Sequence, residues 1–233
     1  MDLDRLQECW IELFSQMRKD PAIDPCRLAA PFLSVEPDGY DPVRSQTILY
    51  IGKATGKKWY RDEFLRDQNV ADQRERTAQF LRECVVPEAY NSSFWRFAWR
   101  LNNLLPEGKE RPFQNIVWTN IAKIGVVKGN PSRSYLARQA ELAQQTLIAE
   151  IRSYRPSLIV FVSGDYGACI VRAVFESFCA SQDDATWQKP TDDIWWRPAD
   201  TNLPAVMCAN HPERKPGRLL QDWVNCAKRL LGG

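Results

Sequence analysis

The sequence predicts an α/β protein, a three-layer αβα sandwich around a central four-stranded, mainly parallel sheet. Short apolar runs rich in Ile, Val and Leu alternate along the chain with longer segments of helical periodicity. Parallel strands need crossover connections, so a repeated helix-then-strand order is typical of a parallel sheet. The four core strands are expected over 47–51, 115–120, 157–162 and 203–209.

The remaining predicted elements fit one domain. An amphipathic helix opens the chain at 3–17, and residues 181–193 are polar and turn-like. No linker is long enough to divide the chain, so we expect a single domain over 1–233 with an N-terminal helical extension over about 1–44. Further helices are expected within 62–85, from Ser92 or Ser93 to 105, over 134–154, over 166–178 and over 219–231, with an edge or hairpin strand over 194–197.

Composition excludes several classes of protein. Of the 233 residues, 44% are hydrophobic and 26% charged, which is ordinary for a globular domain. No run approaches the roughly 18 apolar residues of a membrane span, and the first residues lack the pattern of a signal peptide. The seven cysteines contain no C-x-x-C pair, so neither a disulfide framework nor a metal or iron–sulfur site is expected. We therefore expect a cytoplasmic protein without a cofactor, and no obligate protein partner.

Basic residues gather in two segments although the net charge is only +2. Residues 52–61 and 115–138 carry lysines and arginines without any acid. Affinity for nucleic acid comes from neutralising phosphates at the contact surface, so a local basic face matters more than the total charge. Lys57, Lys58 and Lys123 are the predicted nucleic-acid contacts here, and chance clustering of solvated lysines is the alternative.

Three of the four predicted core strands end in polar loops. These loops are 52–58, 120–123 and 211–217. In an open parallel sheet, ligands bind at the carboxyl ends of the strands. Glycines in the first loop let backbone N–H groups approach a ligand, and its lysines favour an anion. The sequence therefore predicts one site formed by the three loops.

These loops resemble the motifs of the uracil-DNA glycosylase superfamily. Its members carry a first motif of the type G-x-x-P-G or G-x-D-P-Y, an Asn at the end of a middle strand and a late loop of the H-P-S type. The matching residues occur here in the same order: Gly52-Lys53-Ala54-Thr55-Gly56, Thr119-Asn120-Ile121-Ala122-Lys123 and His211-Pro212. The resemblance covers roughly residues 45 to 231. It implies a monofunctional DNA glycosylase, a hydrolase that flips a base from DNA and leaves an abasic site.

The resemblance also implies roles for individual side chains. His211, the only histidine, matches the donor that stabilises negative charge on the departing pyrimidine, and Asn120 matches the amide that reads the base edge. The family's usual carboxylate is absent from the first loop, where the hydroxyl of Thr55 is a candidate to contact water. If Thr55 does not play this part, Asp62 and Glu63 are the nearest candidates in the sequence. Alternatively, the base departs mainly through stabilisation of the leaving group, or the site is inactive.

The first loop also bears on the substrate. Gly56 stands where efficient uracil enzymes place a Tyr that blocks pyrimidine C5, which favours a larger base such as the glucosylated 5-hydroxymethylcytosine of phage DNA, and hence antiviral defence. Repair of uracil or a damaged base is the alternative. Gly52, Lys53, Ala54 and Gly56 are expected to line the pocket, with Trp59 and Tyr60 stacking on the base.

Other readings of the same residues are less favourable. A phosphate-binding P-loop fails on glycine spacing and on Lys58, which stands where a Mg²⁺-binding Ser or Thr is needed. Arg214 and Lys215 occupy the loop that in the family carries an apolar wedge, and they are predicted to contact DNA. The stronger rival is a catalytically inert nucleic-acid-binding module on the same fold.

Overall fold

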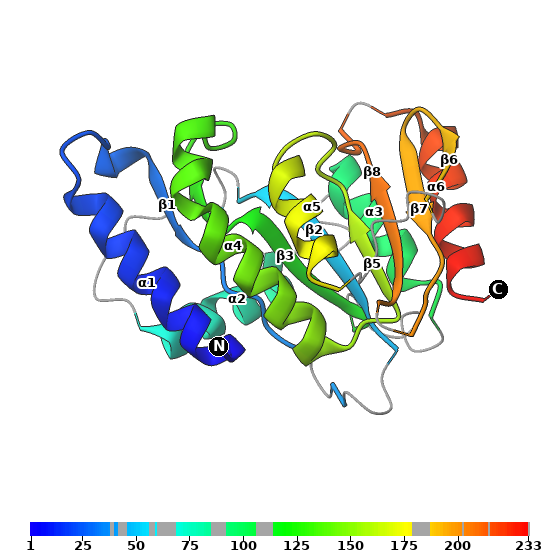
Figure 1. The fold of residues 1–233 in the computed structure, drawn as a ribbon, viewed down its shortest axis with the longest axis horizontal. Coiled ribbons are helices and arrows are strands. Elements are labelled where there is room, and N and C mark those ends of the chain that lie inside the picture. The colour runs from blue at the N-terminus through cyan, green and yellow to red at the C-terminus, as the bar shows by residue number, and fades with distance from the viewer. Residues whose placement is uncertain are drawn as a thin grey trace.

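Six strands form the principal sheet of the computed structural model (Figure 1). The structure describes residues 1–37, 40–41, 46–55, 59, 69–84, 92–105, 114–178, 187–201, 203–213 and 215–232. Four adjacent strands are parallel, and an antiparallel hairpin extends the sheet beyond them, giving the order β3-β2-β5-β8-β7-β6. Their bounds are β2 Ile48–Ala54, β3 Ile116–Ala122, β5 Leu158–Phe161, β6 Gln188–Thr191, β7 Ile194–Arg197 and β8 Ala205–Ala209.

The α/β class is confirmed, but the sheet is mixed and six-stranded rather than four-stranded. The four predicted core strands are the parallel ones, because strands buried on both faces read as continuous apolar runs. β7 was expected as an edge or hairpin strand, whereas β6 falls in the segment predicted to be turn-like. All four residues of β6 are exposed, so it carries no apolar pattern.

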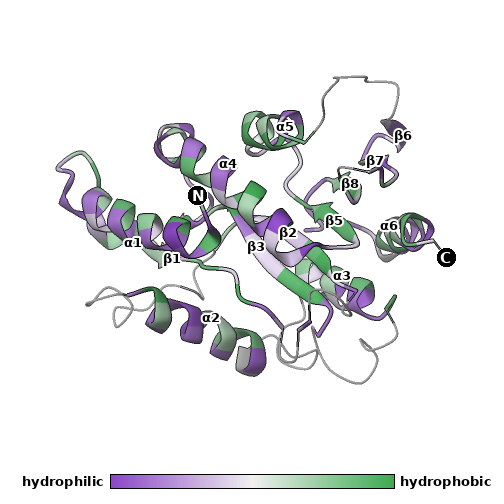
Figure 2. Cartoon of the chain, turned by 60° about the horizontal axis from the view of Figure 1, so that its bottom comes forward, coloured by the Kyte–Doolittle hydropathy of each residue, from purple (hydrophilic) through white to green (hydrophobic). Residues whose placement is uncertain are grey.

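Helices cover both faces of the sheet, as the turned view shows (Figure 2). Leu49 and Ile51 of β2 pack in the cluster that includes α4 and α5, and Ile48 and Tyr50 pack in the cluster on the opposite face, with α3 and α6. This alternation follows from the two-residue period of a strand. The helices are α3 Ser93–Asn102, α4 Arg133–Tyr154, α5 Ala168–Glu176 and α6 Gly217–Leu230.

The N-terminal segment contributes to the core rather than lying outside it. Helix α1 (Leu3–Lys19) packs along α4, and the buried indole of Trp10 donates a hydrogen bond to Thr146 Oγ1 at 2.9 Å. After the short helix η1 (Pro25–Arg27), strand β1 (Leu28–Pro31) pairs antiparallel with β4 (Ile124–Val126) in a second, two-stranded sheet that the sequence did not predict. Helix α2 is Val70–Cys84.

Capping residues explain where three helices begin. Asp2 accepts a hydrogen bond from the Arg5 N–H, Ser92 from the Trp95 N–H and Ser132 from the Tyr135 N–H. Ser92 starts α3 at the carboxyl edge of the sheet, and this position matters for the site below. Within the described ranges, no helix has the length and apolar character needed to cross a membrane.

Candidate active site at the carboxyl edge of the sheet

Gly52 and Asn120 lie opposite one another on the paired strands β2 and β3. A Cβ atom at position 52 would lie 2.5 Å from Oδ1 of Asn120 and 3.2 Å from the ring of Phe94. The first of these distances is a collision with a side chain that is itself buried. Position 52 therefore needs glycine because the Asn120 amide occupies the space that a side chain would take.

The amide of Asn120 is buried and incompletely bonded. The residue is 1% exposed, and Nδ2 has no hydrogen-bond partner among the residues that the structure describes. A buried N–H without a partner costs about 1–3 kcal/mol. Asn120 Nδ2 is one of ten buried side-chain atoms without a partner among the described residues, a set that also includes Thr55 Oγ1 and Trp118 Nε1. What distinguishes Asn120 is its place beside Gly52 at the end of the strand, and a ligand reaches its donor only if the surrounding side chains open.

Phe94 connects this pair to His211. It lies in the first turn of α3, where its carbonyl accepts a hydrogen bond from the Tyr50 hydroxyl at 3.0 Å. The edge of its ring, Cε2 and Cζ, lies 3.2 Å from the Cβ position of Gly52, and the ring stacks on the imidazole of His211, with centroids 5.8 Å apart and planes 18° apart. Phe94 is only partly buried, and its ring also packs against those of Tyr50, Trp95 and Trp118. Four elements, β2, β3, α3 and the loop after β8, therefore meet around this ring.

Phe94 belongs to the candidate site although the sequence does not predict it there. Its spacing fits the apolar stripe of a helix, and the sequence places the stacking residues at Trp59 and Tyr60 instead. The usable signal was the predicted cap at Ser92 or Ser93, because a residue in the first turn of a helix that begins at the carboxyl edge lies beside the strand-end loops.

Hydrogen bonding fixes the imidazole of His211 in one tautomer. The Glu213 N–H donates to Nδ1 at 3.2 Å, so a neutral ring carries its proton on Nε2. Burial lowers the pKa of His211 below its ordinary value, the charge of Lys53 lowers it further, and Glu213 opposes both. Nδ1 also lies 4.0 Å from the Glu213 carboxylate, a pair that needs a protonated ring, but the lowered pKa favours the neutral form. Nε2–H is therefore a neutral donor near neutral pH.

Lys123 does not face solvent, and its predicted contact with DNA is wrong. The side chain is fully buried, and Nζ donates to Oε1 of Glu150 at 2.6 Å and also to Oγ1 of Thr119. The same Glu150 oxygen accepts hydrogen bonds from Thr119 and from Ser34. Burial lowers the pKa of Lys123, and Glu150 partly opposes that shift. This lysine joins β3 to α4 inside the protein and cannot reach a phosphate.

Trp59 is a core residue, and its predicted stacking on a base is also wrong. Its side chain is buried against Phe32 and Phe80, in edge-to-face contacts at 5.1 and 5.4 Å. The indole N–H donates to the Ala30 carbonyl at 3.0 Å. Its polar atom is thus satisfied by the N-terminal segment, leaving Trp59 no face for a ligand.

Two further predicted residues have environments that the sequence did not indicate. Thr55 is buried, and its Oγ1 lies beside Gly125 of β4, where a Cβ would approach it to 2.4 Å. Nothing in this contact directs the hydroxyl toward Asn120 or His211. Lys215 is half-buried, and its Nζ forms an ion pair with Asp193 at 2.6 Å, so it is committed to the protein rather than held ready for a phosphate.

The other predicted site residues divide into two groups. Lys53 and Ala54 are partly buried at the end of β2, and Lys53 is close enough to influence the pKa of His211. The remaining predictions fall outside the described residues: Gly56, Lys57, Lys58, Tyr60 and Arg214. Within the described part of the chain, no group of three or more His, Cys, Asp or Glu side chains is arranged to hold a metal ion.

Comparison with known proteins adds no family. The sequence matches no protein-family model, and it has no match among curated protein sequences.

Proposed function

We propose that this chain is a DNA glycosylase that extrudes a modified pyrimidine and hydrolyses its N-glycosidic bond. The observation that carries the proposal is the convergence of Gly52, Asn120, Phe94 and His211 at one point of the carboxyl edge. These residues supply an aromatic face, a buried amide and a neutral donor, which together suit a planar base. They come from four separate elements, so local sequence does not account for their meeting.

Recognition of the base follows from Phe94 and Asn120. The Phe94 ring offers a stacking surface, and stacking a base on an aromatic ring is worth about 1–3 kcal/mol. The Asn120 amide has both a donor and an acceptor, so it can pair with the edge of a cytosine-like or a uracil-like base. Its unpartnered Nδ2 gains a hydrogen bond when a base acceptor enters.

The proposed role of His211 is to stabilise the negative charge that develops on the departing base. When the bond between C1′ of the sugar and N1 of the base breaks, the electron pair leaves with the base, and charge spreads to the O2 oxygen. A preorganised donor toward that oxygen stabilises the transition state more than the ground state. The Nε2–H of His211 is such a donor, and Lys53 adds positive charge nearby. Water then adds to C1′ and releases a proton.

The proposed substrate class is a pyrimidine larger than uracil, including a hypermodified cytosine of phage DNA. It rests on the glycine at position 56 of the sequence, where a blocking ring would otherwise stand. Excision of uracil or of a damaged base is the alternative substrate range.

An inert nucleic-acid-binding module is the second candidate function. The position of Thr55 favours it, because the hydroxyl proposed to contact water is buried beside Gly125. The described part of the first loop, Lys53-Ala54-Thr55, also supplies no carboxylate. Such a module binds DNA through the same surface and breaks no bond.

The test is excision from defined oligonucleotides. Purified protein is incubated with single- and double-stranded DNA containing uracil, 5-hydroxymethylcytosine or its glucosylated form, and abasic sites are then cleaved with alkali. The proposal expects strand breaks at one of these bases and loss of breaks in His211→Ala and Asn120→Ala. Asn225→Ala, an asparagine on the exposed face of α6, is the matched control and retains activity.

The outcomes separate the candidates. Breaks only at uracil select the repair alternative, and breaks at the glucosylated base select the larger substrate. Binding of all the DNAs without any break selects the inert module. Full excision by both His211→Ala and Asn120→Ala overturns the site assignment.

A further inference from the structure

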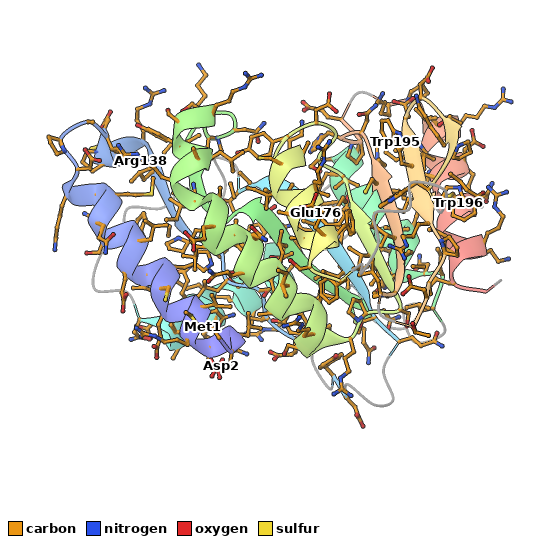
Figure 3. All side chains as sticks on the ribbon, viewed as in Figure 1. Met1, Asp2, Arg138, Glu176, Trp195 and Trp196 are labelled. Atoms are coloured by element: carbon orange, nitrogen blue, oxygen red, sulfur yellow. The ribbon has the colours of Figure 1, made fainter. Side chains whose placement is uncertain are left out.

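We propose that Asp193, in the turn of the β6–β7 hairpin, is the positioning residue that holds the His211 loop in its working geometry. The inference rests on the proposed function for its catalytic meaning, and its structural content stands separately. It assigns a role to a hairpin that the residues of the candidate site do not otherwise use. The hairpin lies on the side of the molecule where Figure 3 labels Trp195 and Trp196, opposite Met1 and Asp2.

One carboxylate oxygen of Asp193 accepts hydrogen bonds from residues on both sides of the histidine. Oδ1 of Asp193 accepts a hydrogen bond from Asn210 Nδ2 at 2.6 Å and another from Lys215 Nζ at 2.6 Å. Asn210 directly precedes His211, and Lys215 follows it by four residues. The Asp193 carbonyl also accepts the Asn210 N–H at 3.1 Å. Three contacts from one residue thus bracket the loop.

Two hydrogen bonds within the described part of the loop support its shape, and the Asp193 contacts add to them. Within it, the Lys215 N–H donates to the Pro212 carbonyl at 3.1 Å, and the Glu213 N–H donates to His211 Nδ1. On the other side, Gly164 lies against the Asn210 side chain, where a Cβ would approach Oδ1 to 3.0 Å. Asn210 is therefore fixed between Gly164 and Asp193, and the orientation of the next residue, His211, depends on that fixed point.

Charge effects and positioning make opposite predictions for the imidazole. The charged groups that act on His211 are Lys53 from β2 and Glu213 from its own loop, while α3 contributes the uncharged ring of Phe94. Removing the negative charge of Asp193 leaves Lys215 unpaired, and by charge alone this lowers the pKa of His211. Loosening the loop instead exposes the ring and frees Nδ1, which raises the pKa toward its ordinary value of about 6.5.

The single histidine makes this measurable without any DNA. Because the chain has one histidine, its imidazole protons give one titrating set of histidine signals in a proton NMR spectrum. The titration is recorded for the parent protein, Asp193→Ala and Asp193→Asn, with circular dichroism as the check of folding. Asp192→Ala is the matched control, since that neighbouring carboxylate is 99% exposed and pairs with Lys189.

We expect Asp193→Ala to raise the pKa of His211 toward 6.5 and Asp192→Ala to leave it unchanged. Asp193→Asn keeps an acceptor oxygen for Asn210, so it should restore much of the parent titration. Where an excised base has been found, kcat falls in Asp193→Ala and KM changes little, because the variant misplaces a transition-state donor.

Two results overturn the inference: a titration of folded Asp193→Ala that superimposes on the parent, or one displaced to lower pH. If Asp193→Ala does not fold, Asn210→Ala removes the Asp193–Asn210 side-chain hydrogen bond without changing any charge and should shift the titration in the same direction by less; no shift there also overturns it. A shifted titration together with no excision of any base overturns the proposed function and leaves the positioning role intact.

Discussion

Glu213 donates its backbone N–H to Nδ1 of His211 at 3.2 Å, and this bond makes Nε2 the protonated nitrogen of a neutral ring. The proposed reaction needs a donor at this position, and a ring that burial and Lys53 keep mainly neutral can still donate. A neutral donor does not need acidic conditions to act. The backbone of Glu213, two residues after the histidine, therefore determines which ring nitrogen carries the proton.

The pH dependence of excision follows from this geometry. Because the pKa of His211 is lowered below 6.5, the ring is less than half protonated at a pH where an exposed histidine is half protonated. If the proposed base release needs the neutral ring, its rate should therefore fall to half only below pH 6.5. Single-turnover rates between pH 5 and pH 8, with folding checked at each pH, test this. A rate already halved at pH 6.5 or above would contradict the neutral-donor account.

Gly52→Ala should damage the site while leaving the fold in place. The added Cβ would lie 2.5 Å from Asn120 Oδ1, so the amide has to move. Displacing a positioning group by about 1 Å can cost roughly 10²-fold in rate. We expect a loss of that order in kcat/KM, measured by alkaline cleavage of the preferred DNA. Gly217→Ala is the control, because a Cβ there meets open space; equal rates for the two variants would show that the Gly52–Asn120 contact is unimportant.

Phe94 should matter through its ring rather than its bulk. Phe94→Leu keeps an apolar side chain but loses about 1–3 kcal/mol of stacking on a base, whereas Phe94→Tyr keeps the ring. The expected order of affinity for DNA carrying the target base is parent, then Tyr, then Leu. Phe178→Leu, beyond the end of α5, serves as the aromatic control. Fluorescence anisotropy measures the affinities, and a Leu variant that binds like the parent would remove Phe94 from the site.

Lys123 should contribute to stability and not to DNA binding. Lys123→Met leaves the Glu150 carboxylate buried without its cation, which typically costs about 3–5 kcal/mol of the free energy of unfolding. Lys123→Met combined with Glu150→Gln leaves no uncompensated charge and should recover part of the loss. Urea denaturation measures both. Lys128→Met, on the exposed loop before α4, is expected to change stability by less than about 0.5 kcal/mol.

The salt dependence of DNA binding gives the second arm of that test. A lysine on the phosphate contact surface contributes to the slope of binding against salt, and a buried one does not. Lys123→Met protein that remains folded should therefore show the parent slope. A reduced slope would show that Lys123 contacts phosphate, as its position in the basic segment 115–138 of the sequence suggested.

The four parallel strands were predictable because their own sequences show the pattern of a buried strand. Strands such as Leu158–Phe161 are apolar throughout, and proline or glycine marks their ends. Two of the strands that were missed lack such signals, whereas β1 (Leu28–Pro31) is apolar and buried but falls in the segment expected to be a helical extension. β6 is Gln-Lys-Pro-Thr, exposed along its length at the sheet edge, and β4 has only three residues. Edge strands are set by the neighbour that they pair with, which a local pattern does not contain.

The site was predictable where a residue follows a strand, and not where a distant partner decides its direction. Gly52, Asn120 and His211 all lie at strand ends, as expected, and the fold places them at the same edge of the sheet; their roles stay predictions. Lys123 is only three residues beyond Asn120, but Glu150 on α4 draws it inward. Trp59 likewise turns to the Ala30 carbonyl of the N-terminal segment. Only the folded chain brings these partners together.

Identification of the released product tests the proposed cleavage of the N-glycosidic bond itself. Protein is incubated with DNA containing each candidate base, and the small-molecule fraction is analysed by mass spectrometry. A glycosylase leaves the intact free base in solution and an abasic site in the DNA, and we expect both to be lost in His211→Ala and retained in Asn225→Ala. Bound DNA with no free base, or free base released equally by His211→Ala, would contradict the proposal.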